Sequence, residues 1–190
     1  SRFNMPEIIN SSGTLQTVQG QPAMDFDGGN DFMPLNSALP DIDTGNCSSF
    51  CVGEYDGTNL NPAEMMLSLG WTNNAARWYA PFNFNDEFIF GYNSTWNEQT
   101  IDQNDTDTHL FTAIAGTDQG NWRCFLDGTQ QGTATRSSRA SGGTYGIGGA
   151  DNVSNYALNG RVTEVLVFDG DCSTLRTAIE KNINDYYNIF

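Results

Sequence analysis

Short apolar runs separated by turn signals at regular intervals constrain the fold of this chain more than any other feature. Aromatic residues make up 12% of the chain, and Gly, Asn, Asp, Ser and Thr are abundant between the runs. Many short strands at such spacing are typical of an all-β sandwich. The predicted strands are Leu15–Val18, Ala23–Phe26, Phe32–Leu35, Ser49–Glu54, Met65–Leu69, Arg77–Phe82, Glu87–Tyr92, Leu110–Ala115, Trp122–Leu126, Gly132–Ser137, Tyr145–Gly148 and Gly160–Phe168.

Two of these segments carry further signals. Trp122–Leu126 runs directly into Asp127-Gly128, and a new run begins within a few residues. This pattern predicts a β-hairpin, because Gly tolerates the positive φ that such a turn needs. Arg161–Phe168 is predicted to be a central strand covered on both faces, because both of its alternating sets contain apolar residues. The sets are Arg161, Thr163, Val165 and Val167 against Val162, Glu164, Leu166 and Phe168.

One amphipathic helix, over residues 173–187, is predicted at the C-terminal end. Asp171 or Ser173 is expected to cap it by accepting a backbone N–H. We expect its apolar stripe to pack against the sandwich and seal an edge or an end. The stripe follows steps of three and four residues: Leu175, Ala178, Ile179, Ile183, Tyr186 and Tyr187.

The length of 190 residues fits one all-β domain. We assign residues 15–190 to this domain, including the helix, and residues 1–14 to an N-terminal extension or arm. Ser1-Arg2-Phe3-Asn4 contains no apolar signal-peptide core. Either a signal peptide was removed or a methionine was cleaved before Ser1, and the second case favours a particle released by lysis, such as a virion.

The net charge of −15 excludes several classes of partner. So acidic a surface repels phosphate backbones, which argues against nucleic-acid binding. No apolar run approaches the roughly 20 residues of a membrane span. The acidity is expected to serve solubility, in a salty or calcium-bearing medium.

The four cysteines leave two alternatives open. An even number permits two disulfides, but four cysteines allow three pairings and spacing does not choose among them. Plain buried thiols are the other alternative. A zinc site is not expected, because the chain has one His and no second Cys pair at metal-ligand spacing. The candidates are Cys47, Cys51, Cys124 and Cys172.

Four stretches, in order, resemble the concanavalin A-like, laminin-G-like jelly rolls of bacterial and phage surface proteins. Ala23–Phe32 resembles the opening strand of that family, hydrophobic-x-Phe-Asp-Gly-x-x-Asp-aromatic, and His109–Ala113 resembles its His-x-hydrophobic strand. Trp122–Gly128 and its following Gly are similar to the family's hairpin, and Ile147–Phe168 is similar to its closing strand. The resemblance implies a jelly-roll sandwich with a trailing helix. It implies little about function, because sites are grafted onto folds.

Catalysis is not expected. Relatives of this fold that cleave β-glucans use Glu-x-Asp-x-x-Glu on a strand, with alternate residues facing the cleft. The nearest match begins at Glu54-Tyr55-Asp56 and places Asn59 where the acid should stand, so a proton donor for the leaving group is missing. His109 has no Ser or Cys in a recognisable nucleophile context, and the resemblance implies a packing or hydrogen-bonding role for it.

Calcium is the metal that the sequence favours, as a structural ion. Asp25, Asp27 and Asp31 surround Gly28-Gly29, and carboxylates suit a hard cation. The resemblance implies a calcium between the first and last strands, which would recruit Glu164 as well. The alternative is that Asp-Gly-Gly-Asn-Asp is simply a turn.

Glycan recognition is indicated by aromatic residues interleaved with asparagines. Aromatic faces stack on sugar rings, and amides read hydroxyl groups. The alternative is that about half of these aromatic residues belong to the core, because one face of a sandwich strand is buried. The candidate binding residues are Trp71, Trp96, Tyr92, Asn73 and Asn93.

The sequence therefore predicts a non-catalytic structural or decoration module on an extracellular particle, most plausibly the head or tail of a phage. Its partners would be other structural proteins of the particle or surface glycans, and oligomerisation is compatible with either. A secreted carbohydrate-binding adhesin is the alternative.

Overall fold

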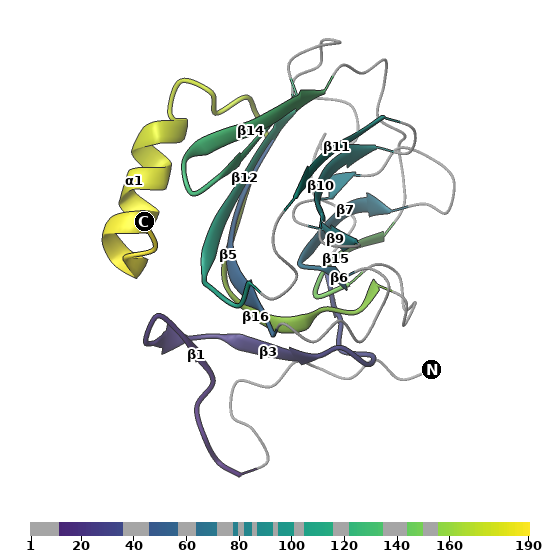
Figure 1. Cartoon of the computed structure of the whole chain (residues 1–190), viewed down its shortest axis with the longest axis vertical. Helices are drawn as coiled ribbons and strands as arrows, with labels where there is room; N and C mark the ends of the chain where they lie inside the picture. Colours follow the sequence, from purple (N-terminus) through teal and green to yellow (C-terminus); the bar gives the residue numbers. More distant parts are fainter. Residues whose placement is uncertain are drawn as a thin grey trace.

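A computed structural model shows a β-sandwich with one helix on its outside (Figure 1). It describes residues 12–35, 46–56, 64–71, 78–79, 82–84, 87–92, 95–100, 105–115, 122–134, 144–149 and 156–190. The elements are β1 (Thr17–Val18), β2 (Gln21–Pro22), β3 (Met24–Asp27), β4 (Met33–Pro34), β5 (Cys47–Tyr55), β6 (Glu64–Met65), β7 (Leu67–Trp71), β8 (Trp78–Tyr79), β9 (Phe82–Phe84), β10 (Glu87–Tyr92), β11 (Thr95–Thr100), β12 (His109–Ala115), β13 (Trp122–Leu126), β14 (Thr129–Ala134), β15 (Thr144–Ile147), β16 (Asn159–Phe168) and α1 (Arg176–Tyr187).

The strands form two layers. One layer is a six-stranded antiparallel sheet in the order β14-β13-β12-β5-β16-β3. Two four-stranded sheets, β4-β15-β7-β8 and β11-β10-β9-β6, make up the opposing layer (Figure 1). The all-β sandwich predicted from the turn spacing is confirmed. The short edge strand β11, which the sequence pattern did not single out, pairs with β10.

The core lies between the layers. Strand β5 is central to it, and every residue of β5 except Glu54 is buried. Alternate residues of β5 face the opposing layer, because side chains of a strand alternate between its two faces. The buried residues of this core are Phe26, Cys47, Cys51, Tyr55, Met66, Leu67, Phe111, Ala113, Cys124, Tyr145, Ile147, Leu158 and Val162.

Helix α1 covers the outer face of the six-stranded sheet (Figure 1). The prediction that it seals an edge or an end of the sandwich is therefore wrong. Phe50, Val52 and Leu110 present a second apolar surface there, and Ile183 and Tyr187 of the helix pack on it. This apolar surface explains the position, because packing the helix on it removes apolar area from water.

Two expectations about the helix are wrong. The helix begins at Arg176, and its N-cap Leu175 makes no side-chain capping bond. Asp171 instead accepts the backbone N–H of Ser173 at 2.8 Å, in the turn before the helix. Leu175 and Tyr186 lie outside the buried stripe and are 58% and 63% exposed.

Strand β16 is paired on both sides, by β5 and β3, and contacts both apolar clusters, as predicted for a strand covered on both faces. Its strict alternation is interrupted by a register shift between Val162 and Glu164. A β-bulge of this kind adds one residue and reverses the phase of the side chains beyond it. Val162 therefore shares the inner face with Val165 and Val167.

The predicted Asp-Gly hairpin is confirmed. Leu126 pairs directly with Thr129, so Asp127 and Gly128 form a two-residue loop. Their φ values are 48° and 74°. Positive φ at both central positions is the signature of a type I′ turn, which matches the twist of the flanking strands.

Candidate ligand-binding pocket

A pocket of about 570 Å³ opens where strands β3, β5 and β16 come together at one end of the six-stranded sheet. Its volume lies within the range typical of small-ligand sites, roughly 300–1,000 Å³. Strand ends and the turn before β12 supply its walls, so the lining comes from four separate parts of the sequence. The lining residues are Asp25, Phe26, Asp27, Glu54, Tyr55, Asp56, Thr106, Asn159, Gly160 and Arg161.

Strand register sets a row of polar groups across this end of the sheet. Arg161 pairs with Glu54 on one side and with Asp25 on the other. Residues opposite each other in neighbouring strands point to the same face, so the three side chains meet. Arg161 Nη1 donates to Glu54 Oε1 at 2.7 Å, and Arg161 Nε donates to Asp25 Oδ1 at 3.1 Å. Thr108 extends the row by donating its hydroxyl to Glu54 Oε2 at 3.0 Å.

The aromatic residues of the lining do not offer stacking platforms. Phe26 and Tyr55 both belong to the core between the layers. The ring of Tyr55 packs edge-on against Phe111, with centroids 6.4 Å apart. The alternation of β3 places Phe26 on that inner face, and the flanking Asp25 and Asp27 line the pocket. Polar groups therefore dominate the described surface of the pocket.

Arg161 stays cationic in this setting. Burial lowers the pKa of its guanidinium, but the hydrogen bond and charge of Glu54, followed by those of Asp25, outweigh burial and raise it. Both oxygens of Glu54 accept hydrogen bonds, from Arg161 and Thr108. Both oxygens of Glu54 are therefore engaged as hydrogen-bond acceptors.

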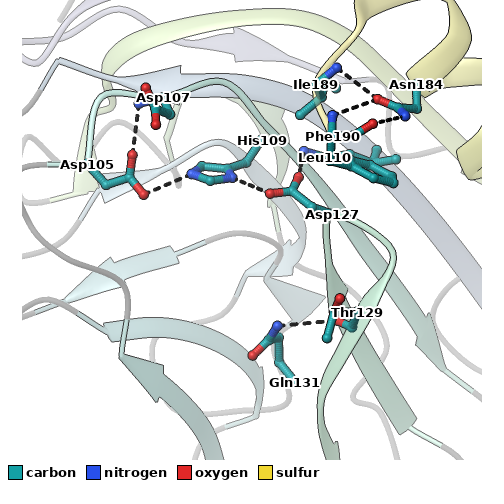
Figure 2. A network of polar contacts seen from close by, with 10 residues as sticks. All are labelled: Asp105, Asp107, His109, Leu110, Asp127, Thr129, Gln131, Asn184, Ile189 and Phe190. Atoms are coloured by element: carbon teal, nitrogen blue, oxygen red, sulfur yellow. Dashed lines mark hydrogen bonds and ion pairs between the residues drawn. The ribbon is translucent and has the colours of Figure 1, made fainter.

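A partly buried ion-pair network holds the turn that carries Thr106, which lines the pocket, and Thr108, which bonds to Glu54. The imidazole of His109 lies between two carboxylates (Figure 2), with Nε2 3.0 Å from Asp105 Oδ2 and Nδ1 2.6 Å from Asp127 Oδ2. Burial lowers the pKa of His109, but the hydrogen bonds and charges of Asp127 and Asp105 together raise it to about 9. At neutral pH both ring nitrogens therefore carry hydrogens and donate.

The structure does not gather the residues predicted to bind calcium into one site. Asp25 is paired with Arg161, and Asp31 accepts the backbone N–H of Asp27 at 3.1 Å within the turn after β3. Glu164 pairs with Val52, whereas Asp27 pairs with Asn159 five residues earlier along β16. Among the described residues, no group of three or more His, Cys, Asp or Glu side chains is placed to hold a metal ion.

The predicted glycan-binding residues lie beyond what the structure describes in side-chain detail. Asn73 and Asn93 fall outside the described residues. Trp71, Tyr92 and Trp96 are described as backbone positions only, in β7, β10 and β11. Trp96 pairs with Gly91 and Tyr92 with Thr95, so two of the candidates occupy neighbouring rungs of one ladder. Asn59, the residue in place of the catalytic acid, is also outside the described part.

All four cysteines are buried free thiols, which is the second of the two alternatives left by the sequence. Cys47, Cys51 and Cys124 lie in the core between the layers, and Cys172 lies under the helix. Burial raises the pKa of both Cys51 and Cys124 to about 12. The neutral thiol is unreactive, so these side chains act as small apolar core residues.

Pocket residues that sequence reasoning missed are Thr106, Asn159 and Arg161. Arg161 was noted only as a strand residue, although it stands next to the acidic pair Asp25 and Glu54 in the sheet. A basic residue at the start of an otherwise apolar strand, in a chain with only eight Lys and Arg, was the available signal.

No family model matches the chain, and no curated protein matches its sequence. Solved structures do match. The CBM40 carbohydrate-binding module of Ruminococcus gnavus IT-sialidase gives a TM-score of 0.60 at 14% identity, covering 83% of this chain and 96% of that one. Domains LG4-5 of the mouse laminin α1 chain give 0.56 at 12% identity, covering 90% of this chain and 48% of that one. A structure of botulinum neurotoxin type C gives a TM-score of 0.55 at 12% identity, covering 97% of this chain and 50% of that one.

These structures share one architecture. Each contains the concanavalin A-like, laminin-G-like jelly roll, and this chain has that fold, as its motifs predicted. In the described part of the chain, no helix is both long enough and apolar enough to span a membrane.

Proposed function

We propose that the chain is a non-catalytic carbohydrate-binding module that acts outside the cell, and that the pocket between β3, β5 and β16 is its sugar site. The observation that carries the proposal is the pocket itself: a cavity of about 570 Å³ whose exposed groups are hydrogen-bonding side chains. A sugar ring presents hydroxyl groups on every side, and carboxylate and amide oxygens accept hydrogen bonds from them.

The structural neighbours support this direction. The CBM40 module has been solved bound to α2,3- and α2,6-sialyllactose, and botulinum neurotoxin type C enters cells through two ganglioside molecules. Those ligands belong to those proteins. They support the view that this jelly roll is suited to glycan recognition, and that a module of this kind works at a surface.

A non-catalytic role is supported by the state of the pocket carboxylates. Glu54 and Asp25 share the guanidinium of Arg161, and Glu54 also accepts the hydroxyl of Thr108. Glycoside hydrolysis needs one protonated carboxyl group beside the leaving oxygen and a second carboxylate at a defined distance. Groups held in this ion-paired row are arranged to bind and not to transfer a proton.

A glycan-array screen of the purified chain, with calcium and with a chelator, tests the proposal. We expect saturable binding that Asp56→Ala weakens by about tenfold, a loss of about 1.4 kcal/mol, because Asp56 is an exposed wall of the pocket. Asp169→Ala is the matched control, since Asp169 is also exposed and follows the opposite end of β16. Absence of binding to every sugar, with and without calcium, would overturn the proposal.

Two finer predictions from the sequence belong with this proposal. A decoration role on a virion is compatible with a surface-displayed sugar-binding module, and purified particles probed with an antibody to this chain would test it. A structural calcium ion that recruits Asp25, Asp27, Asp31 and Glu164 is the other, and a calcium-dependent increase in melting temperature would support it.

A further inference from the structure

The proposed sugar site is strongly acidic. Four carboxylates line it, from Asp25, Asp27, Glu54 and Asp56, together with one guanidinium, from Arg161, so its formal charge is −3. Arg161 is ion-paired to both Asp25 and Glu54. Nε and Nη1 of Arg161 each donate to one of these carboxylates, so the three side chains together carry a formal charge of −1.

The two remaining carboxylates of the lining are exposed to solvent. Asp27 and Asp56 are both exposed, at the ends of β3 and β5. Asp27 Oδ1 accepts the backbone N–H of Gly29 at 2.8 Å, which holds the carboxylate in place. Ionised carboxylates only accept hydrogen bonds. A ligand that fits this wall must therefore bring donors, either hydroxyl groups or an ammonium group.

A carboxylate on the ligand would be repelled by the side chains that accept hydrogen bonds from ligand donors. It would stand among like charges, because the lining carries a formal charge of −3 even with Arg161 included. Repulsion between charges a few ångströms apart is strong in a pocket partly shielded from water, and it weakens as salt is added. Acidic sugars are thus disfavoured by the same side chains that favour neutral or basic ones.

We propose that this pocket selects uncharged or amine-bearing sugar units and rejects anionic ones such as sialic acid. The inference rests on the proposed carbohydrate-binding function and specifies its ligand class. It sets this chain apart from the CBM40 module, which has been solved with sialyllactose bound.

The experiment uses an array on which each neutral glycan is printed beside its sialylated and its amine-bearing counterpart, followed by calorimetry on the strongest neutral ligand and its sialylated form. We expect the sialylated form to bind at least about tenfold more weakly at about 50 mM NaCl, and the difference to shrink at about 500 mM NaCl because salt screens the repulsion.

Charge-neutralising variants connect this preference to the pocket. The double variant Asp27→Asn/Asp56→Asn reduces the formal negative charge of the pocket from −3 to −1, and Asn keeps the turn-forming oxygen at residue 27. We expect it to reduce the discrimination by about threefold or more, because each charge contributes to the repulsion. The matched control Asp169→Asn/Asp185→Asn removes two exposed charges outside the pocket lining and should leave the discrimination unchanged.

Three outcomes would overturn the inference in distinguishable ways. Equal or tighter binding of the sialylated glycan, lost in Arg161→Ala, would reverse the ligand class and leave the proposed function standing. Sugar binding that the pocket variants change in neither affinity nor charge preference would place the site elsewhere. No binding to any saccharide would overturn the proposed function, and this inference with it.

Discussion

Nδ1 of His109 lies 2.6 Å from Oδ2 of Asp127, which ties the first residue of β12 to the turn between β13 and β14 (Figure 2). The same carboxylate accepts the backbone N–H of Leu110 at 2.9 Å. The His109 side chain is only 14% exposed, so water screens the pair weakly. The His109 side chain thus connects strand β12 to the β13–β14 hairpin through Asp127. Through Asp105 it also connects to the turn that carries the pocket residue Thr106.

Replacing this histidine should destabilise the fold in a pH-dependent way. The pKa of His109 is raised in the folded state, from 6.5 to about 9. A raised pKa stabilises the folded state fully below pH 6.5, and the contribution is lost as the pH rises through about 9. We expect His109→Gln to lower the free energy of unfolding by about 2–3 kcal/mol at about pH 6, and by much less at about pH 10.

Urea unfolding of both proteins across this range checks the expectation. The difference between wild type and variant is the informative quantity, because other titrations cancel in it. A difference that stays constant from pH 6 to pH 10 would contradict a protonated His109.

Two glycines with the same backbone conformation should respond differently to alanine. Gly13 and Gly148 have φ values of 80° and 81°. A Cβ on Gly148 would lie 2.0 Å from Cε1 of Phe26, whereas one on Gly13 meets no described atom within 4 Å. We expect Gly13→Ala to cost about 1 kcal/mol from backbone strain and Gly148→Ala about 3 kcal/mol or more, because the ring must move. Chemical denaturation measures both, and equal losses would refute the close packing of Phe26.

The helix should depend on its buried side chains and not on the whole apolar stripe. Ile183 is 4% exposed under α1, whereas Tyr186 is 63% exposed. Ile183→Ala is expected to cost about 2–5 kcal/mol through the cavity it leaves. Tyr186→Ala should cost less than about 1 kcal/mol, because it removes a surface hydrogen bond to Gln21 and an exposed edge-on ring contact with Tyr187. Thermal melting followed by circular dichroism distinguishes the two, and a larger loss for Tyr186→Ala would mean that the helix is rotated.

The thiols should be hidden in the native protein. All four are free and buried, and burial holds the pKa of Cys51 and Cys124 near 12. We expect an aromatic disulfide reagent to label almost no thiol in native protein and all four in guanidinium chloride without reductant. If the reagent labelled no thiol in the denatured, unreduced protein, the cysteines would be paired as disulfides.

Local signals in the sequence predicted local structure well. Asp127-Gly128 predicted a hairpin correctly, because such a turn depends on the φ preferences of its own residues. The two-residue length of the loop was not predicted, since the second strand was expected from Gly132 and begins at Thr129. The start of the helix was predicted less well: Asp171 or Ser173 was expected as the N-cap, and the N-cap is Leu175. Asp171 has the chemistry of a cap, but its side chain serves Ser173 in the preceding turn.

Long-range register could not be read from the sequence, and the pocket depends on it. Asp25, Glu54 and Arg161 become neighbours only because β3, β16 and β5 are adjacent in that alignment. Glu164 was grouped with Asp27 because both lie on terminal strands, yet the pairing of β16 with β3 involves residues 159–162. Alternation also gave no sign of the bulge after Val162, since a bulge changes the phase without changing the composition.

The central claim, that a sugar binds where β3, β5 and β16 meet, is tested most directly by NMR. A ¹⁵N-labelled sample would be titrated with the strongest neutral glycan from the array, and its amide shifts followed. The account predicts that the shifts cluster at residues 25–27, 54–56 and 159–161, with those of Asp169 and the helix unchanged. Shifts confined to the segment that carries Trp71, Tyr92 and Trp96 would contradict it and move the site to the opposing layer.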